Sequence, residues 1–214
     1  SRNDLLMAYS VDLKGSEYYD IFLKDLVTNK IIEEKIENTS GGITWSLDSS
    51  SFFYTPLDNY HRSKKIYKHV LGAPSKDDQL IYEEKDDSFS VSISLTSDEK
   101  FFVISTSDPN TVEEYFFLSK EVNIIPQLFK SRKKGIKYSI DSWKNYWYVH
   151  TNQDAIDYQV LRCDHKNIKK LDVFIPPKEE TIIGGFEFLD NYILRTEKSD
   201  AIPKLFIRDI HKNI

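Results

Sequence analysis

Two short segments of the chain carry residue types that nucleophilic catalysis requires. The first is Cys163-Asp164-His165, in which a thiol lies two residues from an imidazole that could act as its base. Side chains two residues apart on a strand share a face but are spread along it, and free cysteines are usually buried. We therefore interpret Cys163 as a partly buried structural thiol beside a surface histidine, His165.

The second segment, Ser40-Gly41-Gly42, has glycines on only one side of the serine. A serine nucleophile on a strained elbow needs the pattern Gly-x-Ser-x-Gly, which the sequence does not contain. We interpret the segment as a loop that leads into the next structural unit. The sequence thus predicts no catalytic residue and no cofactor.

The histidines do not form a metal-binding pattern. The chain contains five histidines, which are His61, His69, His150, His165 and His211. None of them has the spacing from other possible ligands that a metal site requires. His69 and His150 fall in predicted strands, where we expect them to be hydrogen-bonded within the sheet. We predict no metal site.

Two charged runs could form a binding surface. Glu83-Glu84-Lys85-Asp86-Asp87 is acidic, and Lys130-Ser131-Arg132-Lys133-Lys134 is basic. We interpret the acidic run as a solvated, exposed loop. The alternative is a negative lobe that attracts cationic peptides. The two runs could also pair with each other, and exposed pairs contribute little to stability.

The composition predicts an all-β fold that positions these residues. The chain of 214 residues contains 23 isoleucines but only 4 alanines, and aromatic residues make up 14% of it. β-branched and aromatic side chains favour sheets, whereas alanine favours helices. The mean hydropathy is −0.49, and no apolar run approaches the ~20 residues that a membrane helix needs.

The net charge limits the classes of binding partner, and the cysteine content indicates the cellular compartment. The net charge of −5 disfavours nucleic acid, whose phosphates require a basic surface, and it does not repel a cationic ligand. The single cysteine excludes an internal disulfide, which fits a reducing compartment. We expect a cytoplasmic protein with no nucleic-acid or membrane partner.

One pattern repeats along the whole chain. Hydrophobic strands end in a hydroxyl residue with an aspartate a few residues later, and these hydroxyls belong to Ser10, Thr55, Thr106, Thr151 and Thr196. Their spacings are 45, 51, 45 and 45 residues. Each period contains about four short strands separated by turn residues, which is typical of a β-propeller blade.

The periods predict about four to five four-stranded blades in one partial propeller domain spanning residues 1–214. Their approximate ranges are 1–37, 38–85, 86–131, 132–178 and 179–214. The first and last periods supply only three strands each, so that eighteen strands are predicted in total. We therefore expect the chain to be part of a larger propeller.

The same pattern predicts which residues form the core, which strands lie at blade edges, and which loops share a face of the propeller. We expect Trp45, Phe53 and Tyr67 to bury their rings between neighbouring blades. Pro126 and Pro176 fall in predicted fourth strands, which lie at blade edges where a missing N–H is tolerated. Because adjacent strands alternate in direction, the blade-to-blade loops and the loops after second strands share one face, and the tight turns share the other.

Several motifs together resemble a known family. They are Glu37-Asn38-Thr39-Ser40-Gly41-Gly42, Trp45, Phe53-Tyr54-Thr55, Tyr67-Lys68-His69 with Gly72, Ile81-Tyr82 with the acidic run, Arg132-Lys133, Tyr138-Ser139 with Asp141, Ile175-Pro176-Pro177 and Gly185-Phe186. In these motifs the chain resembles the propeller of the oligopeptidase B (protease II) group of the prolyl oligopeptidase family of serine peptidases. The resemblance extends from about Leu5 to about Ile210.

The resemblance implies a seven-bladed parent propeller that covers an α/β-hydrolase domain, its partner in the same polypeptide. It implies a Ser-Asp-His triad that cleaves short peptides after Arg or Lys, and a propeller that selects substrates by size. No position here matches the triad or the hydrolase domain, so we expect the chain alone to be inactive. A stand-alone propeller that serves as a protein-interaction scaffold is the alternative.

An incomplete ring would leave its end blades uncovered. Unpaired strand edges and apolar faces promote association with another chain. We therefore expect the chain to self-associate through its Leu5–Leu26 end, its Ile182–Ile210 end, or one against the other.

Overall fold

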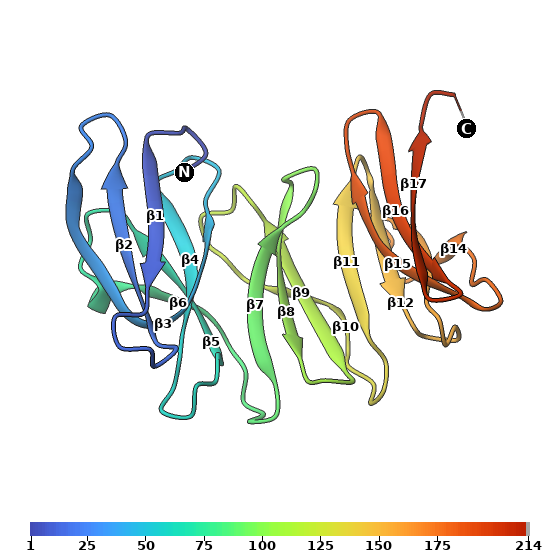
Figure 1. Cartoon of the computed structure of the whole chain (residues 1–214), viewed down its shortest axis with the longest axis horizontal. Coiled ribbons are helices and arrows are strands. Elements are labelled where there is room, and N and C mark those ends of the chain that lie inside the picture. The colour runs from blue at the N-terminus through green and yellow to red at the C-terminus, as the bar shows by residue number, and fades with distance from the viewer. Residues whose placement is uncertain (213–214) are drawn as a thin grey trace.

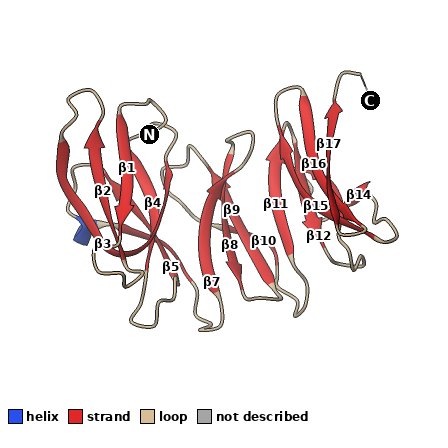
Figure 2. Cartoon of the chain, viewed as in Figure 1, coloured by secondary structure: helices blue, strands red, loops and turns tan. Residues whose placement is uncertain are grey.

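The computed structural model describes residues 1–212, so the last two residues of the predicted fifth blade, Asn213 and Ile214, lie outside the described part. These residues form four antiparallel sheets that follow one another along an arc (Figure 1). The all-β propeller prediction is confirmed. Strands dominate the described chain, and Ser75–Asp77 form a short 3-10 helix (Figure 2).

The strands follow the chain order from one sheet to the next. The first sheet contains β1 (Leu6–Val11), β2 (Tyr19–Asp25), β3 (Ile31–Trp45), β4 (Ser51–Pro56), β5 (Lys65–Val70) and β6 (Gln79–Glu83). The second contains β7 (Ser90–Leu95), β8 (Phe101–Ser107), β9 (Val112–Leu118) and β10 (Gln127–Lys130). The third contains β11 (Tyr138–Trp143), β12 (Tyr146–Thr151), β13 (Gln159–Asp164) and β14 (Asp172–Ile175), and the last contains β15 (Thr181–Phe188), β16 (Tyr192–Ser199) and β17 (Ile202–Asp209).

Strand β3 differs from the prediction because it runs through two predicted blades. Its first half pairs with β2 and its second half with β4, with a shift of register between Thr39 and Ile43. Ser40-Gly41-Gly42 is therefore a bulge within a bent strand and not a loop. Gly41 has a φ of +86°, and a Cβ there would lie 3.0 Å from the Tyr19 ring. Only glycine fits this bend, which carries the chain from one blade to the next without ending the strand.

Strands β4, β8 and β12 are buried on both faces. Phe52, Phe53 and Tyr54 in β4 are all less than 9% exposed. The apolar runs of β8 and β12 are buried in the same way. This burial explains why their sequences are continuous apolar runs without alternation. A neighbouring sheet covers each face of β8 and β12, and one face of β4 is covered by β2 and β3 of its own bent sheet.

The predicted inter-blade aromatic residues lie in two clusters. Phe53 is buried against Phe102 and Phe117 of the second sheet, with ring centroids 4.7 and 5.8 Å away. Trp45 and Tyr67 are only half-buried and pack on the opposite side, in the cluster built around residues of β2 and β4. The prediction is confirmed for Phe53, whereas Trp45 and Tyr67 are less buried than expected.

The prolines flank the short outer strands of two sheets. Pro126 immediately precedes β10, and Pro176 immediately follows β14. Both strands lie at a sheet edge, as predicted. Strand β10 begins only at Gln127, because the missing N–H of Pro126 removes one ladder hydrogen bond.

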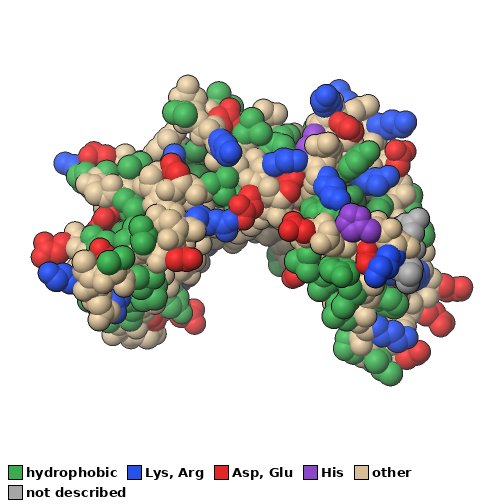
Figure 3. All heavy atoms as spheres, turned by 90° about the horizontal axis from the view of Figure 1, so that it is seen from above, with side chains coloured by type: hydrophobic (Ala, Val, Ile, Leu, Met, Phe, Trp, Pro, Cys, Tyr) green, Lys and Arg blue, Asp and Glu red, His purple; other side chains and the backbone are tan. Residues whose placement is uncertain are grey.

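The chain presents two faces of different character. The loops 57–64, 84–89 and 131–137 lie together at the bottom of Figure 1, and we call this side the loop face. The tight turns 96–100, 144–145 and 189–191 lie at the top, and we call this side the turn face. Viewed from the turn face, the molecule is an arc with one hollowed side (Figure 3).

Candidate functional site

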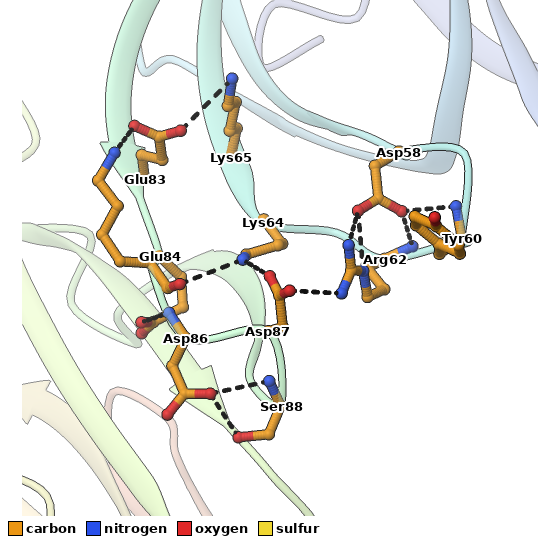
Figure 4. Close-up of polar contacts among 11 residues, drawn as sticks. Asp58, Tyr60, Arg62, Lys64, Lys65, Glu83, Glu84, Asp86, Asp87 and Ser88 are labelled. Carbon is orange, nitrogen blue, oxygen red and sulfur yellow. Dashed lines mark hydrogen bonds and ion pairs between the residues drawn. The ribbon is translucent and has the colours of Figure 1, made fainter.

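The loop face contains a cavity of about 390 Å³ between the β4–β5 loop and the chain that leaves β6. Charged side chains dominate its wall, and the lining residues are Pro56, Leu57, Asp58, Arg62, Lys64, Lys65, Tyr67, Glu83, Glu84 and Lys85. Figure 4 shows the polar contacts around it. The acidic run that the sequence singled out forms one side of this cavity.

Asp58 organises the β4–β5 loop. Its carboxylate accepts hydrogen bonds from the backbone N–H groups of Tyr60 at 2.8 Å and Arg62 at 3.0 Å. The Arg62 side chain closes the loop, because its Nε donates to Asp58 Oδ2 at 2.8 Å. A short aspartate that caps its own loop is a standard turn device, and here it also fixes the direction of the Arg62 guanidinium.

Asp87 connects this loop to the acidic run. Its carboxylate lies 3.1 Å from Nη1 of Arg62 and accepts a hydrogen bond from Lys64 (Figure 4). The bond from Lys64, followed by that from Arg62, lowers the pKa of Asp87. Asp87 is exposed, as predicted for this run, and its pairing keeps the loop in place without removing the charge from solvent.

Glu84 departs from the expectation of an exposed acidic run, because its side chain is only 4% exposed. It accepts hydrogen bonds from Thr106 Oγ1 and Arg132 Nη2, both at 2.7 Å, and from the backbone of Asp86 at 2.8 Å. Burial alone would raise the pKa of Glu84, but these donors outweigh it and lower the pKa. One member of the predicted exposed run is therefore a buried anchor.

Arg132 ties the basic run to two sheets. Besides Glu84, its backbone N–H donates to Glu113 Oε2 at 2.7 Å, and its guanidinium lies 4.0 Å from the centre of the Phe89 ring. The two charged runs therefore do pair, through the buried contact between Arg132 and Glu84. The neighbouring Lys133 and Lys134 stay exposed on the surface.

The predicted nucleophile candidates are engaged in structural contacts. Ser40 Oγ shares a hydrogen bond of 2.5 Å with Thr55 Oγ1 rather than with a base. Cys163 is 3% exposed, and burial raises its pKa to about 11. Cys163 is thus fully buried rather than partly buried, and His165 is half-buried against Phe101 rather than on the surface.

Sequence reasoning missed an acid–base cluster around His69. Its Nδ1 lies 2.7 Å from Asp78 Oδ1, and its Nε2 contacts Glu34. The hydroxyl of Tyr54 donates to the other oxygen of Asp78 at 2.8 Å. His69 is 1% exposed, so this cluster cannot reach a substrate and instead joins β3 to β5. No short spacing connects positions 34, 69 and 78, so the sequence offered no signal.

The other site expectations concern histidines and metals. His150 Nε2 lies 2.7 Å from the carbonyl oxygen of Ile183, so both His69 and His150 are hydrogen-bonded in strands, as expected. Within residues 1–212, no group of three or more His, Cys, Asp and Glu side chains is arranged to hold a metal ion. The same residues contain no helix of the length and hydropathy that crossing a membrane would require.

Two curated relatives align with most of the chain. Protease 2 of Moraxella lacunata is 29% identical over 192 residues, which are 88% of this chain and 28% of the relative. Dipeptidyl aminopeptidase BI of Pseudoxanthomonas mexicana is 28% identical over 209 residues, which are 96% of this chain and 29% of the relative. The chain thus spans less than a third of the length of these relatives.

Solved structures and a family match agree with these alignments. Oligopeptidase B from Leishmania major superposes with a TM-score of 0.90 over 98% of this chain and 30% of its own, at 23% identity. Residues 1–213 match the family described as prolyl oligopeptidase, N-terminal beta-propeller domain. Because this match covers nearly the whole chain, the protein belongs to the prolyl oligopeptidase family, and its residues lie in the N-terminal β-propeller domain.

Proposed function

We propose that this chain is the substrate-gating part of an oligopeptidase B-like serine peptidase that cleaves short peptides after Arg or Lys. The observation that carries the proposal is the likeness to oligopeptidase B over 98% of the chain, supported by the alignment with Protease 2. Family membership supplies the peptidase class, and the closeness to this group favours basic residues over proline at the cleaved bond.

In this proposal the loop face docks on the hydrolase domain. The loops 57–64, 84–89 and 131–137 lie together there, and loops on a rigid scaffold are where binding surfaces usually form. The pair of Glu84 and Arg132 fixes two adjacent sheets at this face, while Lys133, Lys134 and Asp87 offer exposed charges. A fixed rim with exposed charges suits a domain interface that must stay closed to folded proteins and admit peptides.

The charge of the chain supports a basic substrate. The net charge of −5 creates an attractive field for peptides that contain Arg or Lys. Catalysis would come from the hydrolase domain, because Ser40 is hydrogen-bonded to Thr55 and Cys163 is buried. We propose accordingly that the chain alone is inactive, and that the peptidase works in the cytoplasm, as the single cysteine suggests.

The test begins with the reading frame beyond residue 214. A downstream hydrolase domain with a Gly-x-Ser-x-Gly elbow is expected, and the longer protein should then be expressed and purified. It should be assayed with matched fluorogenic peptides that place Arg, Lys or Pro before the cleaved bond. We expect the Arg and Lys substrates to be cleaved and the Pro substrate to be spared.

A length series tests the gating role separately. Peptides of increasing length with one central Arg, and a folded protein with exposed arginines, should show a fall in cleavage with size. Preferential cleavage after Pro would contradict the specificity, and rapid cleavage of the folded protein would contradict gating. A stop codon soon after residue 214 would instead support the interaction-scaffold alternative.

A further inference from the structure

A second cavity lies on the turn face, opposite the loop face. Its volume is about 760 Å³, and turns from three consecutive sheets form its wall. The lining includes Asp98, Glu99, Trp143, Lys144, Phe188 and Asp190. Aromatic rings and carboxylates therefore meet in one open cavity, which the loop-face proposal does not use.

The aromatic side of this cavity already holds a cation. The Trp143 indole stacks on Phe188 with centroids 5.1 Å apart and an interplanar angle of 16°. Nζ of Lys144 lies 4.2 Å from the centre of the Trp143 ring. An indole face attracts ammonium and guanidinium groups more strongly than other aromatic rings do. The geometry thus identifies the chemical class of ligand that this surface accepts.

The carboxylates of the cavity differ in their availability. Asp98 accepts a hydrogen bond from Ser142 Oγ at 3.0 Å and lies 3.3 Å from Nζ of Lys100. Glu99 forms an ion pair with Arg2. Asp190 is exposed and has no hydrogen bond or ion pair to any other residue in the described range 1–212. It is the acidic group at this cavity that can receive a new cation.

Lys144 occupies an unusual backbone position for its residue type. Its φ is +56°, in the left-handed region that asparagine and glycine adopt more readily than lysine. The turn itself therefore does not favour a lysine here. An asparagine at this position would keep or improve the turn while removing the ammonium group from the Trp143 ring.

We propose that the turn-face cavity binds the basic side chain of a peptide. The incoming guanidinium or ammonium stacks on Trp143 and pairs with Asp190, and it displaces Lys144, which acts as a built-in competitor. The site lies on the face opposite the proposed hydrolase contact and requires no catalysis. Its binding can therefore succeed or fail independently of the peptidase proposal.

Isothermal titration of the full 214-residue chain tests this site, with tri-arginine amide as the probe. Tri-citrulline amide, which has nearly the same shape without the charge, should bind much more weakly. Lys144→Asn should strengthen tri-arginine binding about threefold or more, and Asp190→Asn should weaken it by about the same factor.

Two control variants separate the site from general charge effects. Lys166→Asn and Glu179→Gln make the same charge changes at exposed positions that do not line the cavity, and they should leave the affinity within about twofold of the parent chain. Thermal unfolding checks that each variant folds. Equal binding of both tripeptides would overturn the proposal, as would a Lys144→Asn variant that binds no more tightly than Lys166→Asn.

Discussion

The second sheet and the last sheet are built from similar residues but differ in burial. Ile104 in β8 is completely buried, whereas Ile207 in β17 is 61% exposed. The second sheet is covered by a sheet on each side, so Phe102 packs against Phe53 while Phe101 packs against Trp147. The last sheet is covered on one side only. Burial in this fold therefore depends on neighbouring sheets more than on the sequence of the strand itself.

The side of the last sheet that faces the third sheet is buried, as the sides of the second sheet are. Ile183, Phe188 and Ile193 are at most 7% exposed and pack against Tyr148 and Val160 of the third sheet. On its other side, the apolar residues Leu205 and Ile207 are exposed. Along β17 itself, every residue before Asp209 is exposed. The last sheet thus differs in two ways, because no sheet covers its outer side in the described structure and β17 is its exposed edge strand.

The largest expected contrast comes from one phenylalanine in each sheet. Phe102→Ala should lower the free energy of unfolding by about 3–5 kcal/mol, because it empties a closed core position. Phe206→Ala should cost less than about 1 kcal/mol, because its ring is 39% exposed. Urea titration of both variants at low protein concentration measures the contrast. Equal losses would contradict the difference in burial between these two phenylalanines.

A buried carboxyl group makes the contact between the second and third sheets pH-dependent. Burial raises the pKa of Glu114 to about 8, although the backbone N–H of Ile140 donates to it at 2.6 Å. The folded chain then holds a proton that the unfolded chain has released above its ordinary pKa of 4.5. This contribution to stability is present below pH 4.5 and is lost as the pH rises towards 8.

The matched variant for this prediction is Glu114→Gln, which resembles the protonated side chain at every pH. Relative to this variant, the parent chain should lose roughly 2 kcal/mol of stability between pH 5.5 and pH 7.5. Urea titrations at both pH values provide the measurement. If the difference between the two proteins stayed constant over this range, Glu114 would not be protonated in the folded chain.

The smallest contrast concerns two arginines that pair with buried glutamates. Arg132→Leu should cost about 1–2 kcal/mol, because it leaves Glu84 without its cation at the junction of two sheets. Arg195→Leu in the last sheet should cost less, because Lys178 still lies 2.7 Å from Glu197. Denaturant titration of the two variants ranks them. A larger loss for Arg195→Leu would reverse the comparison.

The sequence predicts the sheets well because local patterns determine them. The hydroxyl period and the apolar runs such as Phe101–Ile104 locate the second strands, and prolines mark the edges. The glycines around Gly41 predict a loop where the structure has a bulge, because a bulge and a loop share the same glycines.

The site was only partly predictable because its key contacts join distant positions. Glu84 was expected to be exposed since its neighbours are charged, and its burial depends on Thr106 and Arg132, which lie 22 and 48 residues away. The cluster of Glu34, His69 and Asp78 likewise forms only when two sheet segments meet. Side-chain patterns specify strands, but they do not specify which polar groups the folded sheets bring together.

Light scattering over a concentration series tests most directly whether the last sheet is open on its outer side, where Leu205 and Ile207 are exposed. We predict that the mean mass rises with concentration, because exposed strand edges and apolar faces promote contact between ends. Ile207→Lys should reduce this rise, whereas Val122→Lys, at an 84% exposed position between β9 and β10, should not. A strictly monomeric chain at high micromolar concentration, with cooperative thermal unfolding, would contradict an open outer side of the last sheet.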